Sequence, residues 1–117
     1  MLTFNLKKER FEKIKSGEKT HEYREVKPYW TKRLLKYIGG YSSYTITDGN
    51  FLVLNIYDKP FDLPIEFVCG YADKGNKNNR LKALLKIIKV LRSGKNTDLA
   101  IDKDVYDIEF ELIKEQQ

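Results

Sequence analysis

Three charged side chains in the segment "KTHEYRE" (19–25) have the types and the spacing to bind a polar ligand. Glu22 and Arg24 stand two positions apart, which puts both on one face if the segment is a strand. On that face the carboxylate and the guanidinium can pair with each other. Alternatively, they present an acceptor and a forked donor to a planar ligand such as a nucleobase or a phosphate. Lys19, at the turn before them, can reach toward the same side.

The same segment is unusual as a strand because neither of its faces is apolar. A half-buried strand alternates apolar and polar residues, whereas polar groups here occupy nearly every position. The two faces are Thr20, Glu22 and Arg24 on one side, and Lys19, His21, Tyr23 and Glu25 on the other. Two interpretations stay open: the charges line a wet ligand site, or the Glu22–Arg24 pair fastens the strand to the next helix.

Aromatic residues flank the polar strand and suggest contacts with bases. Tyr29 and Trp30 stand next to a basic stretch, and rings beside Lys and Arg make a stacking platform for single-stranded bases. Trp30 lies on the apolar face of its helix, which favours packing in the core. We therefore expect the exposed rings to be Tyr29, Tyr41 and Tyr44.

The residue inventory argues against several common classes of enzyme. His21 and Cys69 are the only histidine and cysteine, too few for the usual metal sites. No Walker loop, dinucleotide fingerprint, G-x-S-x-G motif or zinc-ligand spacing is present. We expect neither a metal nor a cofactor. The single cysteine also excludes an intrachain disulfide and predicts an ordinary buried thiol in a reducing compartment.

The positive charge of the chain is concentrated near its beginning. Residues 7–36 hold eleven Lys or Arg and five Glu, a balance of +6, whereas the whole chain carries +5. The remaining residues therefore sum to −1. Such asymmetry suggests a polyanionic partner, although a solvated lysine-rich helix surface explains the charge equally well.

Size and composition indicate one domain that spans residues 1–117. The chain is 41% hydrophobic and long enough to bury about two-thirds of its unfolded surface. Its first apolar stretch, "MLTFNL", is too short for a signal sequence or a membrane span. We expect a cytoplasmic protein of bacterial or viral origin, with no membrane partner.

Hydrophobic periodicity and capping residues predict seven elements that position these side chains. Gly17 is expected just after the first helix and Pro28 in the first turn of the second. The elements are a strand at 2–6, a helix at 7–16, the polar strand at 18–26, a helix at 28–38, and strands at 51–57, 64–70 and 104–113.

One further segment, "RLKALLKIIKVLRSG" (80–94), fits either type of element. Its leucines recur at helical spacing, and Gly94 stands where it could cap a helix. Against that, Ile87, Ile88 and Val90 favour a strand, and a fully buried strand also reads as a continuous apolar run. Local evidence alone favours the helix.

The polar strand carries a motif that resembles a known family. Gly17, Lys19, Glu22 and Arg24 form G-x-K-x-x-E-x-R directly after an amphipathic helix, which looks like the signature of the ASCH domain, a branch of the PUA-like superfamily. The resemblance continues through "REVKPYWTKRL" and resumes at "FDLPIEFVCGYADK", both similar to a subgroup common in bacteria and phages. We call residues 17–24 the signature.

The resemblance implies an α+β fold. Its expected core is a PUA-like, partly closed β-barrel with two or so N-terminal helices packed against it, and a cleft beside the signature strand. In that fold residues 80–91 form a barrel strand, so we predict a strand there. Residues 39–60 are extra relative to the family pattern, and we expect this insertion to form its own hairpin at the mouth of the cleft.

The function that the resemblance and the basic N-terminal quarter together imply is the binding of RNA or a nucleotide. The predicted ligand-binding residues are Lys19, Glu22, Arg24, Tyr23 and Tyr29.

Two other functions remain open. One ASCH branch removes the acyl group from N4-acetylcytidine with a Lys and a Thr of this motif, which makes Lys19 and Glu22 candidate catalytic residues of a metal-independent amidohydrolase. Glu22 stands where that branch has its threonine, so the hydroxyl nucleophile is missing, and Thr20 replaces it only if the register slips. The other alternative is a protein-interaction adaptor that uses the insertion as its contact surface.

Overall fold

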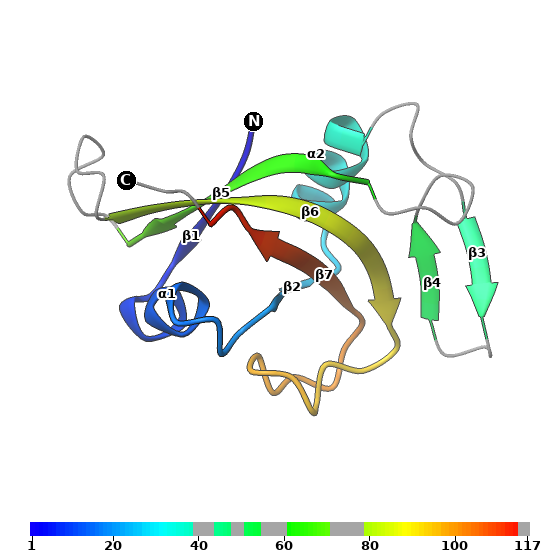
Figure 1. Cartoon of the computed structure of the whole chain (residues 1–117). Coiled ribbons are helices and arrows are strands. Elements are labelled where there is room, and N and C mark those ends of the chain that lie inside the picture. Colours follow the sequence, from blue (N-terminus) through cyan, green and yellow to red (C-terminus); the bar gives the residue numbers. More distant parts are fainter. Residues whose placement is uncertain (39–43, 48–50, 55–60, 71–78, 115–117) are drawn as a thin grey trace.

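The computed structural model describes residues 1–38, 44–47, 51–54, 61–70 and 79–114. It shows an α+β fold in which two helices lie in the N-terminal third of the chain (Figure 1). The helices are α1 (Lys8–Lys15) and α2 (Pro28–Ile38). The strands are β1 (Leu2–Leu6), β2 (His21–Glu25), β3 (Tyr44–Thr47), β4 (Phe51–Leu54), β5 (Leu63–Cys69), β6 (Arg80–Leu91) and β7 (Val105–Leu112).

All the described strands belong to one mixed sheet built around the long strand β6. One edge of β6 pairs with β7, and β7 pairs in turn with β2. The other edge pairs first with β5, over residues 80–85, and then with β4, over residues 88–91. The pair β1–β5 is parallel and the other pairs are antiparallel. The path β1-β5-β6-β7-β2 therefore runs from one N-terminal strand to the other.

This five-strand path curls into a half-barrel, as the predicted partly closed barrel requires (Figure 1). Its interior is filled by apolar side chains from the strands and helices, including the fully buried rings of Phe4, Phe11 and Phe67. The half-barrel brings β1 and β2, its two ends, toward each other around that core. The predicted fold class is confirmed.

The prediction of a strand at residues 80–91 is confirmed, and the sheet explains why the segment resembles a helix. Leu81, Ala83 and Leu85 alternate inward, and then the register against β7 shifts between Leu85 and Ile87. A bulge of this kind inserts one residue and changes which positions face the core. The next fully buried residue is therefore Ile88, three positions after Leu85. Alternation plus one bulge imitates helical spacing.

Both helices bury the faces that their sequences predict. Phe11 and Ile14 of α1 are buried, and Gly17 follows the C-cap residue Ser16 with a φ of +87°. A residue with this backbone conformation is usually glycine. In α2, Leu34 is buried, whereas Trp30 and Tyr37 are partly buried against the core. None of the helices that the structure describes is long and apolar enough to span a membrane.

The predicted insertion at residues 39–60 contains an antiparallel strand pair, β3 with β4. Since β4 pairs with the edge of β6 that faces away from β7, two strands separate this pair from β2. The position of the hairpin at the mouth of a cleft stays a prediction. Tyr41 lies outside the described residues, as does the side chain of Tyr44. Cys69, predicted to be buried, is only partly buried at the end of β5.

Candidate functional site

The backbone around the signature places Lys19 in the turn between α1 and β2, and Glu22 and Arg24 in β2 itself. The left-handed turn at Gly17 ends α1, and the Lys19 amide then donates a hydrogen bond to the Lys13 carbonyl at 3.0 Å. Beyond this turn, Glu22 pairs in register with Ile108 of β7. Lys19 precedes the first residue of β2. The alternation of side chains between the two faces of the strand therefore does not fix the direction of its side chain.

The Glu22 carboxylate is the centre of the signature and is fully buried. Its Oε2 accepts a hydrogen bond from Arg24 Nη2 at 3.0 Å, and its Oε1 accepts one from the Tyr23 amide at 2.9 Å. Lys19 Nζ lies 3.4 Å from the same Oε1. A buried carboxylate is tolerated only when it is paired and hydrogen-bonded in this way. Glu22 therefore holds the two cations in place.

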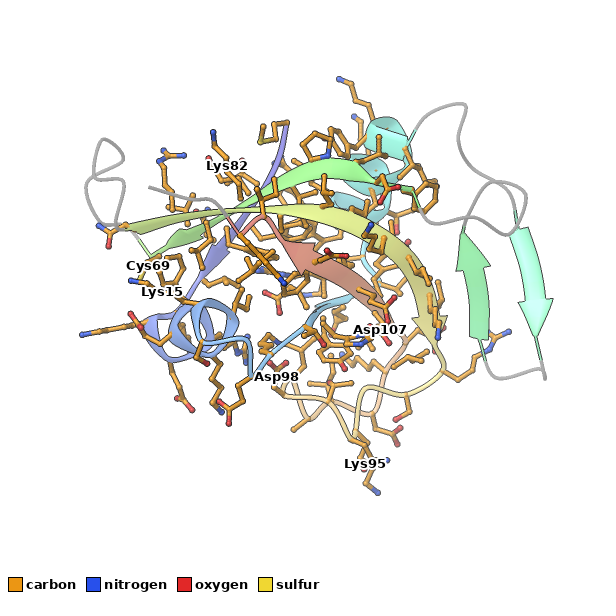
Figure 2. All side chains as sticks on the ribbon, in the orientation of Figure 1. Lys15, Cys69, Lys82, Lys95, Asp98 and Asp107 are labelled. Carbon is orange, nitrogen blue, oxygen red and sulfur yellow. The ribbon has the colours of Figure 1, made fainter. Side chains whose placement is uncertain are left out.

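Lys19 lies between two carboxylates and is nearly buried. Its side chain is 9% exposed, and its Nζ lies 2.5 Å from Asp98 Oδ2 in addition to the contact with Glu22. Asp98 comes from the loop between β6 and β7 (Figure 2). Arg10 of α1 also reaches this loop, with Nη2 3.3 Å from the Asp98 carbonyl. The loop is thereby fastened to the turn that precedes β2.

Arg24 faces aromatic rings rather than a second carboxylate. Its Cζ lies 4.8 Å from the ring centroid of Trp30 and 5.4 Å from that of Phe4. Its Nη2 donates to the Asn5 carbonyl at 3.0 Å as well as to Glu22. Among the residues that the structure describes, Arg24 Nε is the one buried side-chain nitrogen or oxygen without a hydrogen-bond partner. The side chain as a whole is 20% exposed.

A series of cations and rings continues from Arg24 along α2. Arg33 Cζ lies 5.8 Å from the Trp30 ring and 5.1 Å from the Tyr29 ring. Trp30 stacks on Phe4 with centroids 5.2 Å apart and packs against the core, as its place on the helix predicts. Tyr29 meets Trp30 edge-on at 5.3 Å and is 60% exposed. The prediction of an exposed ring at Tyr29 is confirmed.

A groove of about 640 Å³ lies on the outer side of this series. We call it the α2 groove, and its lining residues are Met1, Leu2, Tyr29, Lys32, Arg33, Lys36 and Tyr37. Helix α2, which supplies most of these lining residues, has no Asp or Glu between Pro28 and Ile38. Within the described part of the chain, neither lysine of the groove nor Arg33 forms an ion pair. The groove therefore presents uncompensated positive charge around an exposed ring.

His21 and Tyr23 lie on the other face of β2, beside β7. His21 Nδ1 lies 2.6 Å from Asp107 Oδ1, and its Nε2 lies 3.5 Å from Glu109 Oε1. The ring of Tyr23 lies under the Lys19 ammonium, 5.0 Å from Nζ. Burial raises the pKa of Tyr23, and the nearby carboxylates of Asp107, Asp98 and Glu22 raise it further. Across the described residues, no group of three His, Cys, Asp or Glu side chains is arranged to hold a metal ion.

The structure thus brings Lys19, Glu22 and Arg24 together, with Tyr23 against Lys19. Tyr29 stands apart from them and is reached through Trp30. Sequence reasoning missed Asp98, because nothing local indicates which side chain a loop far along the chain will bring to Lys19. It counted the cations of α2 within the basic residues 7–36 but did not name them as site residues, although a helix with three cations and no acid is a readable signal.

This arrangement suits binding better than covalent catalysis. The contacts of Lys19 with Glu22 and Asp98 are those of an ammonium group, which has no lone pair for attack on a carbonyl. The Glu22 side chain has no exposed surface from which to activate a water. The polar side chains that a ligand can reach are instead Arg24 and the cations of α2.

Comparisons of the chain with protein-family models, with curated proteins and with solved structures found no match. The α+β half-barrel with two helices near the N-terminus therefore rests on the structure itself.

Proposed function

We propose that this protein binds RNA or a nucleotide, as a module of the ASCH, PUA-like kind, at the surface where the signature strand meets α2. The observation that carries the proposal is the continuous series Arg24, Trp30, Arg33 and Tyr29, which leads from a buried carboxylate to an exposed ring. The order of helix, glycine turn and charged strand, together with the half-barrel, supports the family resemblance.

The series has the components that single-stranded bases need. Stacking of a base on an aromatic side chain contributes about 1–3 kcal/mol and tolerates any base, because every base has a π-face. Tyr29 offers such a face, and Arg33 lies over the same ring, where it can also reach a phosphate. Arg24 adds a side chain that Glu22 holds in place and that is 20% exposed.

In this proposal the signature residues have different roles. Glu22 orients Arg24 and is not itself in contact with the ligand, because it is fully buried. Lys19 and Tyr23 hold the carboxylate end of the site together through Asp98 and Glu22. The predicted ligand-binding set thus divides into direct contacts, Arg24 and Tyr29, and residues that position them.

Direct titration tests the proposal. We would measure fluorescence anisotropy of labelled single-stranded RNA, duplex RNA and free nucleotides with the wild type, with Tyr29→Ala and with Leu35→Ala. Leu35 is also exposed on α2 but does not line the groove, so its variant is the matched control. We expect Tyr29→Ala to weaken binding and Leu35→Ala to leave it unchanged. If single-stranded RNA, duplex RNA and free nucleotides all fail to bind at low salt, the proposed function is refuted and the protein-interaction adaptor is favoured.

A further inference from the structure

The cations of α2 differ from those elsewhere around the site. Arg10, Lys19 and Arg24 are each engaged by a carboxylate, so the positive charge next to the signature is already paired. Lys32, Arg33 and Lys36 are exposed, and no ion pair joins them to another described residue. Lys8 and Lys15 of α1 are also exposed, but α1 carries Glu9 and Glu12 as well, whereas α2 has no acidic residue. Beside Tyr29, the remaining attraction for an anion therefore lies on one face of α2.

The shape of the α2 groove combines this charge with an apolar surface. Leu2 is buried beneath the groove, Tyr37 is partly buried, and the three cations stand around them. The volume of about 640 Å³ falls in the range of about 300–1,000 Å³ that is usual for small-ligand sites. An apolar surface surrounded by cations suits a ligand with flat apolar parts and regularly spaced negative charges.

The spacing of the cations favours an extended chain over an isolated anion. Lys32 and Lys36 are one helical turn apart, about 6 Å along the axis. Arg33 follows Lys32 and lies one turn beyond Tyr29 on the same face. Several successive phosphates can each meet a different cation here, whereas a free mononucleotide would engage only some of them. A base can stack on Tyr29 only if it is unpaired.

We propose that the α2 groove binds the sugar–phosphate backbone of a single-stranded nucleic acid. Lys32, Arg33 and Lys36 contact its phosphates, and one base lies on Tyr29. This inference rests on the proposed function and deepens it, because it names the ligand class and three contact residues outside the signature. The aromatic ring favours a polynucleotide over an acidic peptide, which would need the cations alone.

The first experiment tests two of the three contact residues, Lys32 and Lys36, through the salt dependence of binding. For an oligonucleotide of about eight residues, a length within the usual single-strand site sizes, anisotropy titrations at several salt concentrations give the slope of log K against log salt. Three phosphate contacts predict a slope near −2, and loss of two contacts should make it shallower by about 1.4. The test variant combines Lys32→Gln with Lys36→Gln.

The matched control combines Lys8→Gln with Lys15→Gln. These two lysines are also exposed on a helix, and the net charge changes by the same amount. We expect the control to keep the wild-type slope. Equal loss of slope in both double variants would overturn the inference, because it would show that only the overall charge matters. Thermal unfolding confirms that each variant is folded.

A second experiment tests the ligand class. We expect the oligonucleotide to bind more tightly than a mononucleotide. We also expect a single strand, whether RNA or DNA, to bind at least ten-fold more tightly than the corresponding duplex. A polyglutamate peptide that competes as well as the oligonucleotide at equal charge would contradict the proposal. If RNA binds but its slope is unchanged by the α2 variant, the groove is refuted and RNA binding stands. If neither a nucleic acid nor a free nucleotide binds, both proposals fail.

Discussion

The guanidinium of Arg24 donates a hydrogen bond from Nη2 to the backbone carbonyl of Asn5 at 3.0 Å. Arg24 belongs to β2 and Asn5 to β1, and these strands are the two ends of the half-barrel. A side chain thus joins edges that the backbone ladder leaves apart. The same guanidinium pairs with Glu22, so a residue of the signature links a buried charge to the shape of the sheet.

Arg24→Ala should destabilise the fold. Removal of one partner of a buried ion pair leaves the other charge uncompensated, which typically costs about 3–5 kcal/mol. Glu22 is fully buried but keeps Lys19 at 3.4 Å, so we expect a loss at the lower end of that range. Urea unfolding measures the change. Lys27→Ala is the control, since its exposed pair with Glu25 should contribute no more than about 1 kcal/mol. An Arg24→Ala variant as stable as the wild type would show that Glu22 is satisfied without it.

Gly17→Ala should lower stability through the backbone alone. Gly17 has a φ of +87°, and an added Cβ would meet no atom within 4 Å, so no steric clash contributes. An L-residue in the left-handed region costs about 1–2 kcal/mol, and asparagine tolerates it better than alanine. We expect thermal unfolding to rank the wild type first, Gly17→Asn second and Gly17→Ala last. Equal stability of the two variants would contradict this explanation of the turn.

Stability should fall at alkaline pH, in part because of Tyr23. Burial first, and then the nearby carboxylates, raise the pKa of Tyr23 above its ordinary value of 10.0. The unfolded chain therefore ionises this phenol at a lower pH than the folded protein. The contribution of Tyr23 is intact below the unfolded pKa and is lost as the pH rises through the folded one.

The free energy of urea unfolding, measured on both sides of that pH, tests this dependence. Tyr23→Phe should lose less stability than the wild type over the interval, because its ring cannot ionise. Tyr29→Phe changes an exposed ring and serves as the control. A Tyr23→Phe variant with the same alkaline dependence as the wild type would show that other groups cause the loss.

The protein should show little or no deacylation of N4-acetylcytidine. Lys19 is held between two carboxylates, and Glu22 is sealed from water. Chromatographic detection of released cytidine measures turnover, with N4-acetylcytidine in buffer without the protein as the background. Robust turnover that Lys19→Ala abolishes in a folded protein would reverse the order of the proposals and make Lys19 catalytic.

Much of the local structure could be predicted from sequence. Each of three segments must bury one apolar face, and its sequence shows that face as a period. The period is helical in residues 7–16 and 28–38 and alternating in residues 104–113, so the type of each element can be predicted. The strand at 80–91 is different. Its bulge against β7 hides the alternation, and a comparison with a family pattern was needed to choose the strand over the helix.

The sequence by itself determined which residues could do chemistry near the signature, because Lys19, Glu22 and Arg24 are close along the chain. Only the tertiary structure decided which of them remain available. Asp98, from a loop far along the chain, forms an ion pair with Lys19. Arg24 lies instead against the ring of Trp30 on α2. The physical reason is that charges are neutralised through space, by partners whose approach depends on how the whole sheet curls.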